Sequence, residues 1–282
     1  MAQFKTYCYE IKLLSNMHVG SGDANYGIID KLVQRDPVTQ NPIVHASSLK
    51  GALREFFMEQ DLNGLDKDEF VNYVFGSAPK EKVKLKNGEY RFFSADLFLL
   101  PVRSNHQQYY LGTNIDIAKN LIDKLELLGI KNDEINKLSQ KLTALSKKEV
   151  SEKPVLFEGD AKTILEDYEV TLQPSVSIEI KELNEQYGKK MALFGDNFSE
   201  LTKNLPVIAR NQLNNGKSEN LWYEEIVPHQ SRFITFVSVP TGVENFFDQF
   251  NKELTSSLIQ VGANGSIGYG LCKFTLLNPE KP

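Results

Sequence analysis

The sequence predicts an α+β fold, and three observations lead to this class. Apolar and polar residues alternate in residues 4–15, which is typical of a β-strand. Apolar residues recur at helical spacing from Leu49 to Phe57, which predicts an amphipathic helix. Further helical stretches stand between runs of strands without a strict βαβ alternation. This order favours an α+β architecture over a doubly wound parallel sheet.

The composition indicates a globular chain with a real hydrophobic core. The 282 residues are 41% hydrophobic and 24% charged, close to an average folded protein, which excludes disordered and disulfide-stapled classes. No apolar stretch approaches the length of a membrane helix, and the first residues lack the pattern of a signal peptide, so we expect a cytoplasmic protein without membrane contact. Cys8 and Cys272 lie in expected strands and read as buried free thiols.

The net charge of −5 argues against indiscriminate binding to polyanions. A local basic groove on an acidic body remains compatible with this balance.

The first elements follow one another in short order. Residues 18–27 form a glycine-rich loop, residues 28–36 read as a second strand, and residues 37–42 form a turn bounded by prolines. Ser47 and Ser48 stand ahead of the helix that follows, where a serine would be a suitable N-cap.

The later elements are spaced more widely along a single domain that we expect to cover residues 1–282. Asn87-Gly88 marks a candidate hairpin, and residues 94–104 read as an apolar strand interrupted at Pro101. Residues 116–149 are helical in composition, and residues 116–171 together look like a mainly helical insertion. We also expect a long exposed hairpin at 204–226, an amphipathic helix at 244–258, and a glycine-rich loop at 262–270 before the last strand.

Several common catalytic motifs do not occur in the sequence. It contains no GxxxxGK[ST] phosphate loop, no H-E-x-x-H, no paired CxxC and no GxSxG. The segment GANGSIGYG resembles a dinucleotide fingerprint, but its glycines are misplaced and it precedes a strand. A nucleotide-cofactor enzyme is therefore rejected.

The two glycine-rich loops and the helix start suggest a cradle for phosphates. Closely spaced backbone N–H groups accept anionic oxygens, and a helix N-terminus adds the positive end of its dipole. Lys50 and Arg54 lie four residues apart, hence on one helical face, where both reach one sugar–phosphate segment. The alternative is that the glycines serve tight turns and the two cations are a solvated face. The candidate residues are Gly20, Ser21, Gly22, Ser47, Ser48, Lys50, Arg54, Gly262, Gly265 and Gly268.

Two further polar residues are candidates for chemistry. Asp30 follows the first loop, where its carboxylate could hold a divalent ion or orient an attacking hydroxyl. His18 could act as an acid–base group or a phosphate donor. A surface aspartate and a hydrogen-bonded histidine beside a turn are the plainer alternatives.

Taken together, these segments resemble the RAMP superfamily of CRISPR RNA-binding proteins. The blocks that carry the likeness run in the family's order from about residue 7 to residue 274 and cover most of the chain outside the middle insertion. Within the superfamily the likeness is greatest to the repeating backbone subunits of type III-B, or Cmr, interference complexes. The blocks are IKLLSNMHVGSG, YGIIDKLVQRDPVTQNPIVHASSLKGALREFF, VFG, ADLFLLPVRS, LWYEEIVP and GANGSIGYGLCKF.

This resemblance implies a ferredoxin-like palm, similar to an RNA-recognition motif, with a β-hairpin thumb and a helical insertion. It implies stacking of copies along a guide RNA, together with other Cmr subunits, and cleavage of single-stranded target RNA at regular intervals beside each thumb. Asp30 falls on the family's cleaving aspartate, for which a divalent metal, Mg²⁺ or Mn²⁺, is expected. His18, Lys50 and Arg54 fall in motifs that line the guide-RNA groove. Arg210 and Asn211 fall in the thumb, and the four glycines from Gly262 to Gly270 fall in the signature loop.

One departure and two alternatives remain at this point. Family members often carry P-G-S-S-L-K-G where this chain has Val44-His45-Ala46 before the serines, so the loop geometry is open and His45 is an additional donor near phosphate. A non-catalytic RNA-binding scaffold would bind the same RNA without cutting it. A stand-alone endoribonuclease that processes guide precursors would depend on acid–base residues such as His18.

Overall fold

The core of the molecule is a four-stranded antiparallel arrangement with ferredoxin-like order. The computed structural model describes residues 4–22, 27–62, 64–77, 87–242 and 244–279. The strands lie in the order β15, β1, β13, β4, and each neighbouring pair is antiparallel. Helix α1 follows β1 and helix α7 connects β13 to β15, so the chain order is β1-α1-β4-β13-α7-β15. The α+β prediction is confirmed. The bounds are β1 Phe4–Leu13, α1 Ala46–Glu59, β4 Ala95–Arg103, β13 Arg232–Pro240, α7 Glu244–Ser256 and β15 Leu271–Leu276.

Aromatic side chains join α1 and α7 on one face of this sheet. The rings of Phe57 in α1 and Phe250 in α7 stack with centroids 5.1 Å apart, and Phe70 packs against Phe57 at 5.4 Å. All three side chains are buried. Burial of such rings supplies most of the driving force for this packing, because each removes a large apolar area from water. The helical spacing noted from Leu49 to Phe57 is therefore the face that meets the core.

Strand β1 is more deeply buried than its alternating pattern predicts. Residues 7–11 are all buried because β1 lies between two strands and has protein on both faces. Glu10 lies on the face away from Tyr9 and pairs with Arg232. Cys8 and Cys272 are buried free thiols, as predicted, and burial raises the pKa of Cys272 to about 12.

The segment predicted as a strand at residues 28–36 is not one. Residues 28–36 make isolated bridges only, which join Gly20 with Val33, Lys31 with Glu224 and Arg35 with Pro42. The apolar run reflects contacts with three different partners, so no continuous ladder forms. The predicted turn at 37–42 is present and is held by Asp36, whose Oδ1 accepts from the backbone N–H groups of Val38 and Thr39.

Helix α1 begins at Ala46, before the two serines that were predicted to precede and cap it. Its N-cap is His45, which makes no side-chain capping bond, so Ser47 and Ser48 lie inside the first turn. Strand β4 runs through Pro101 without interruption. At that position β4 pairs only with β5, so the missing N–H of Pro101 costs no second ladder bond.

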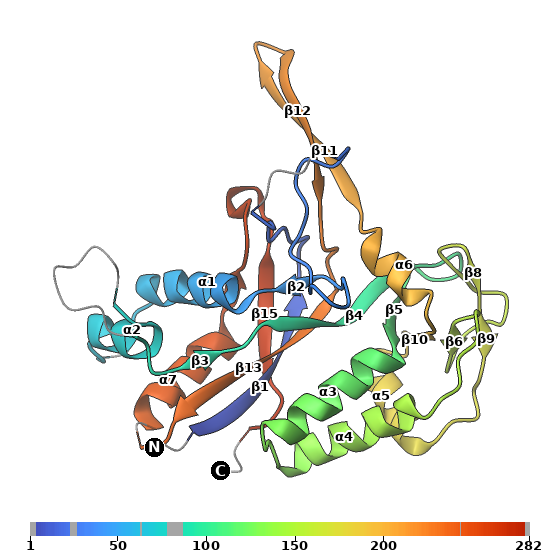
Figure 1. Ribbon diagram of the computed structural model, residues 1–282, viewed down its shortest axis with the longest axis horizontal. Helices are drawn as coiled ribbons and strands as arrows, with labels where there is room; N and C mark the ends of the chain where they lie inside the picture. Colours follow the sequence, from blue (N-terminus) through green and yellow to red (C-terminus); the bar gives the residue numbers. More distant parts are fainter. Residues whose placement is uncertain (1–3, 23–26, 63, 78–86, 243, 280–282) are drawn as a thin grey trace.

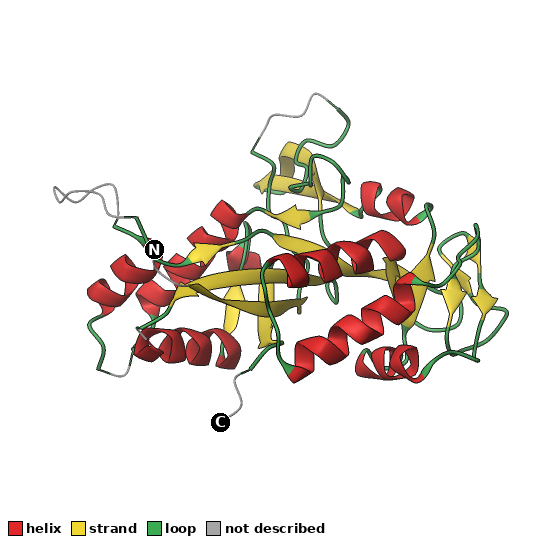
Figure 2. Cartoon of the chain, turned by 60° about the horizontal axis from the view of Figure 1, so that its bottom comes forward, coloured by secondary structure: helices red, strands yellow, loops and turns green. Residues whose placement is uncertain are grey.

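A second group of helices lies at the other end of the sheet. Figures 1 and 2 show α1, α2 and α7 at one end and α3, α4 and α5 at the other. Residues 116–149 are mainly helical, as predicted, and the stretch to 172 adds short strands. Here the sheet continues from β4 through β5, β10 and β6 to β9. The bounds are α2 Lys67–Phe75, β5 Tyr109–Asn114, α3 Ile115–Leu127, α4 Asp133–Ser146, β6 Val155–Leu156, β7 Ile164–Leu165, β8 Tyr168–Glu169, β9 Thr171–Leu172, α5 Ile178–Gln186 and β10 Met191–Phe194.

The chain after Asn87-Gly88 pairs differently from the predicted hairpin. Strand β3, Arg91–Phe92, pairs with β13, and Asn87 bridges to Gly76. Residues 78–86, which would form the other arm, lie outside the described residues.

The predicted exposed hairpin is present and projects from the sheet. Strands β11, Val207–Asn214, and β12, Lys217–Glu225, pair antiparallel after the short helix α6, Phe198–Lys203. Figure 1 shows the hairpin standing clear of the rest of the molecule. Its turn uses positive φ at Asn215 and Gly216, the geometry that matches the twist of two-residue hairpins. Strand β14, Leu258–Gln260, pairs with β15 before the last loop, which contains a 3₁₀ turn at Gly265–Ile267. Among the described residues no helix is both long and apolar enough to cross a membrane.

Candidate RNA-binding and cleavage site

Asp30 lies at the base of the hairpin and is exposed. The backbone N–H groups of Asp30 and Lys31 both donate to the carbonyl oxygen of Tyr223 in β12, at 3.1 Å each. In return the N–H of Tyr223 donates to Asp30 Oδ2 at 2.7 Å. These bonds fix one carboxylate oxygen against β12, and within the described parts of the chain Oδ1 has no hydrogen-bond partner. The carboxylate is thus both held in place and open to a ligand.

His18 is 3% exposed and contacts the end of β12. Its Nδ1 is 2.7 Å from the carbonyl oxygen of Glu225, and its Nε2 is 3.6 Å from Glu224 Oε1. Its own carbonyl oxygen accepts from the N–H of Ala263 at 2.8 Å. The structure therefore gives His18 a place between the hairpin and the last loop, where its ring contacts protein groups on both nitrogens.

The glycines of the last loop have local reasons to be glycine. Gly262 has φ +89°, and a Cβ there would lie 2.5 Å from the carbonyl oxygen of His18. Gly270 has φ +72°, and a Cβ there would lie 2.0 Å from the carbonyl oxygen of Val261. Both contacts are shorter than any carbon atom tolerates, so the tight-turn reading holds at these two positions. Gly268 also has positive φ but open space around it, and Gly265 is in the exposed part of the loop.

Glu224 joins the hairpin to this loop, a role that no local sequence pattern indicates. Its side chain is 1% exposed, pairs with Arg210 Nε across the hairpin, and accepts from Asn264 Nδ2 at 2.9 Å. Burial alone would raise the pKa of Glu224, but the hydrogen bonds from Arg210 and Asn264 and the nearby charges hold it below its usual value. The Arg210 guanidinium also lies 4.6 Å above the ring of Tyr269. Arg210, predicted to contact RNA, is engaged in this internal network.

The predicted phosphate-binding residues at the start of α1 have different surroundings in the structure. Ser47 is exposed, and Ser48 Oγ accepts from Gln34 Nε2 at 2.9 Å. Lys50 Nζ lies 5.9 Å from the ring centre of Phe92. Arg54 Nη1 donates to the carbonyl oxygen of Gly76 at 2.9 Å, where α2 ends. Arg54 therefore contacts the end of α2, and a shared contact of Lys50 and Arg54 with one phosphate segment stays a prediction.

Gln34 connects the first loop to α1 and was also missed. It is buried, and its Nε2 donates to the carbonyl oxygen of Gly20 at 3.2 Å as well as to Ser48. Its Oε1 accepts from the N–H of His45 at 2.8 Å. One amide side chain thus ties the loop that carries Gly20 to the first turn of α1. A glutamine in a polar stretch carries no pattern that would reveal this.

The remaining predicted RNA contacts are Ser21, Gly22 and Asn211. Ser21 and Gly22 are exposed, and the N–H of Ser21 donates to the carbonyl oxygen of Leu32 at 2.9 Å. Asn211 is exposed on the hairpin, where its Oδ1 accepts from Ser218 Oγ at 2.7 Å.

The donor set for a metal ion consists of one carboxylate. No group of three or more His, Cys, Asp or Glu side chains that could hold a metal occurs in the described ranges, Asp30 included. Mg²⁺ is commonly bound through one or two carboxylates together with phosphate oxygens and water. The residues present therefore fit an ion that arrives with RNA phosphates and does not reside in a protein cage.

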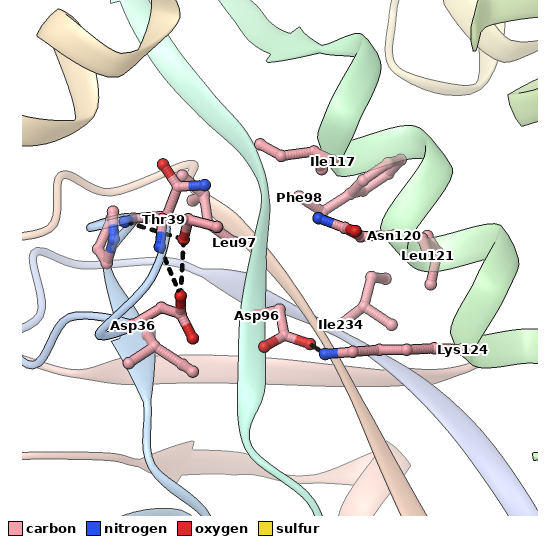
Figure 3. Close-up of a pocket in the computed structure, with 13 residues that line it drawn as sticks. Asp36, Thr39, Asp96, Leu97, Phe98, Ile117, Asn120, Leu121, Lys124 and Ile234 are labelled. Carbon is pink, nitrogen blue, oxygen red and sulfur yellow. Dashed lines mark hydrogen bonds and ion pairs between the residues drawn. The ribbon is translucent and has the colours of Figure 1, made fainter. Parts of the chain in front are cut away.

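A separate cavity of about 250 Å³ lies between the turn at 37–42, β4 and α3. Figure 3 shows Lys124 reaching from α3 to Asp96 on β4, with Asp36 across the opening. Burial raises the pKa of Asp96 in spite of this partner. None of the predicted site residues lines the cavity. It is distinct from the surface at Asp30.

Comparison with known proteins places the chain in a family. The RAMP superfamily model matches residues 10–273. The chain is 29% identical to the CRISPR system Cmr endoribonuclease Cmr4 of Pyrococcus furiosus, over 96% of each chain, and 24% identical to the CMR subunit Cmr4 of Saccharolobus solfataricus, over 95% of each.

Solved structures agree with this placement at the level of the fold. A subunit of the type III-B Cmr-beta complex in its apo state matches with a TM-score of 0.80 at 22% identity, over 96% of each chain. Oligomeric Cmr4 from Pyrococcus furiosus matches with a TM-score of 0.71 at 23% identity, over 96% of this chain and 98% of that one. The chain therefore belongs to the RAMP superfamily.

Proposed function

We propose that the chain is a guide-RNA-binding backbone subunit of a type III-B CRISPR effector complex and that it cleaves target RNA within that complex. The observation that carries this proposal is the position of Asp30, an exposed carboxylate fixed by backbone bonds to the base of a protruding hairpin. The relative from Pyrococcus furiosus is named an endoribonuclease, and a structure of a related complex is described as bound to cognate target RNA. Copies of this chain and other Cmr subunits are the proposed partners.

The proposed chemistry is an attack by a target-strand 2′-hydroxyl on its own 3′ phosphate. An A-form duplex keeps these groups out of line, and a hairpin that displaces one base pair allows the flanking nucleotide to rotate into line. The 2′ oxygen bonds to phosphorus while the bond from phosphorus to the 5′ oxygen of the next nucleotide breaks. That oxygen takes a proton from water, which gives 2′,3′-cyclic phosphate and 5′-hydroxyl ends. Asp30 Oδ1 is the group available to accept the 2′-hydroxyl proton while Oδ2 stays bound to Tyr223.

A divalent ion, Mg²⁺ or Mn²⁺, is part of the proposal. It would be held by Asp30 and by RNA phosphates, and it would neutralise charge that develops on the phosphate. Oδ1 is the free oxygen in either case, so holding the ion and accepting the hydroxyl proton are alternative roles for Asp30.

The test is Asp30→Asn in the assembled complex with its guide RNA. The variant keeps the shape and the bond from Tyr223 but removes the charge, so we expect guide and target binding to persist and cleavage to be lost. Gel analysis of end-labelled target should give regularly spaced products with wild-type protein, none with the variant and none in excess chelator. A variant that cuts at the wild-type rate would exclude Asp30 from the mechanism.

The same experiment distinguishes the proposed function from the two alternatives, a non-catalytic scaffold and a guide-precursor endoribonuclease. A scaffold would bind target without any spaced products. A guide-precursor endoribonuclease would cut repeat RNA as an isolated chain, but the ring of His18 is enclosed by Glu224 and Glu225, which does not favour an acid–base role for it.

A further inference from the structure

The segment that carries Asp30 is held at separate points and is not part of a continuous strand. In residues 30–35, here called the Asp30 segment, the bridges to other parts of the chain are isolated ones. Backbone bonds join it to Val19, to Tyr223 and to Glu225. The side chains that bind it act together with these bonds to fix where the Asp30 carboxylate lies.

Glu225 binds this segment at three residues. Its backbone N–H donates to the carbonyl oxygen of Lys31 at 2.9 Å, and its Oε2 accepts from the N–H of Val33 at 3.0 Å. Its Oε1 pairs with the guanidinium of Arg35. The side chain is 3% exposed, so these are charge-assisted bonds in a site that largely excludes water.

Arg35 extends the connection to the other arm of the hairpin. Its Nη1 donates to the carbonyl oxygen of Thr202 at 2.6 Å, and its Nη2 donates to that of Lys203 at 3.3 Å. These carbonyls close α6, which leads directly into β11, whereas Glu225 ends β12. The pair thus fastens the Asp30 segment to both arms where the hairpin leaves the sheet.

We propose that the Arg35–Glu225 ion pair is a positioning device for RNA cleavage, which holds the Asp30 carboxylate at a fixed place on the hairpin base. The inference rests on the proposed function. Glu225 is buried, and the guanidinium of Arg35, whose side chain is 15% exposed, is bound by Glu225 and by the end of α6. The ion pair acts through the position of the Asp30 carboxylate. In-line reactions are very sensitive to such positions, because a shift of about 1 Å costs on the order of a hundredfold in rate.

The first test is Glu225→Gln in the assembled complex. Glutamine still accepts from Val33 but loses the charge that holds Arg35. We expect the single-turnover rate of target cleavage to fall about tenfold or more, while guide content and target affinity stay at wild-type values. Arg35→Gln should give the same split between rate and affinity, and the double variant should be no worse than either single one, because the pair acts as a unit.

Glu10→Gln is the matched control. Glu10 is also a buried carboxylate paired with an arginine, Arg232, and it accepts from the hydroxyl of Tyr187 at 2.8 Å. Neither partner belongs to the Asp30 segment or the hairpin. We expect a loss of thermal stability like that of Glu225→Gln with cleavage at the wild-type rate.

If Glu225→Gln fails to assemble, Arg35→Lys answers the question. Lysine keeps a positive charge beside Glu225 but lacks the fork that reaches the carbonyls of α6. An intermediate cleavage rate at full target affinity supports the proposal.

Two results would overturn the positioning role. One is wild-type cleavage by Glu225→Gln and Arg35→Lys; the other is a rate that falls only in proportion to lost RNA binding, or equally in Glu10→Gln. If Asp30→Asn still abolishes cleavage in that case, the proposed function stands and only the positioning role fails. Wild-type cleavage by Asp30→Asn removes the proposed function itself.

Discussion

Glu224 and Glu225 are consecutive residues of β12, so their side chains project to opposite faces of the hairpin. Glu224 faces Arg210 and the glycine-rich loop, and Glu225 faces the Asp30 segment. Two buried carboxylates in succession are unusual in a strand, since each must be paired to offset its loss of hydration. Here both are paired, and together they fix the hairpin base from two sides.

A pH dependence follows for Glu224. Its pKa is lowered on folding, so its ionised form stabilises the protein above the ordinary carboxyl pKa, and this contribution is lost as the pH falls through the lowered value. We expect Glu224→Gln to lower the free energy of unfolding by about 1–3 kcal/mol at pH 7. The difference from wild type should shrink as the pH falls below the ordinary carboxyl range. Urea titrations at a series of pH values measure it, and a difference that stays constant with pH would contradict the assignment.

At the scale of elements, the close approach at Gly262 explains why the backbone of the last loop fits against residues 18–19, and that at Gly270 brings the end of the loop back against Val261. The predicted glycine-rich loop was correct, but its contact with His18 could not be read from the sequence, because the two segments are more than 200 residues apart. The hairpin, the long helices and the first strand were predictable, since each has a local pattern. The Asp30 segment was not, because contacts with three partners leave a strand-like run that forms no strand.

Two glycines of the same loop allow the cost of close contact to be measured apart from the cost of backbone strain. Gly262→Ala combines positive φ with a Cβ 2.5 Å from the His18 carbonyl oxygen, whereas Gly268→Ala has positive φ in open space. We expect Gly268→Ala to cost about 1–2 kcal/mol from strain alone. Gly262→Ala should cost clearly more, because the loop must also move off His18. Denaturation midpoints compare the two, and equal losses would show that the close approach is absent in solution.

At the scale of the whole molecule, the hairpin projects from the sheet while its base is fastened to the Asp30 segment and the last loop (Figure 1). The hairpin that would distort the RNA and the carboxylate that would act on it therefore belong to one connected unit. The order of the ferredoxin-like core was expected from resemblance to the family. The fastening was not, because Arg35, Glu224 and Glu225 read in sequence as ordinary surface charges.

A shortened hairpin tests the role of its tip, which would displace a base pair, apart from the role of its base, which holds Asp30. The register pairs Asn211 with Leu221, so joining these two residues through Asn-Gly removes residues 212–220 and leaves a two-residue turn. Arg210, Glu224, Glu225 and the bonds from Tyr223 to Asp30 all remain below the cut.

The shortened chain should fold, copurify guide RNA in the complex and hold Asp30 as before. It should cut target at least tenfold more slowly, because the base pair beside Asp30 would no longer be displaced and the 2′-hydroxyl would stay out of line. Thermal denaturation and guide content serve as the controls for folding and assembly. A target bearing an unpaired nucleotide opposite Asp30 should restore part of the rate, since it supplies the distortion that the missing tip would have made. Cleavage by the shortened chain at wild-type positions and rate would instead mean that the hairpin tip takes no part in opening the duplex.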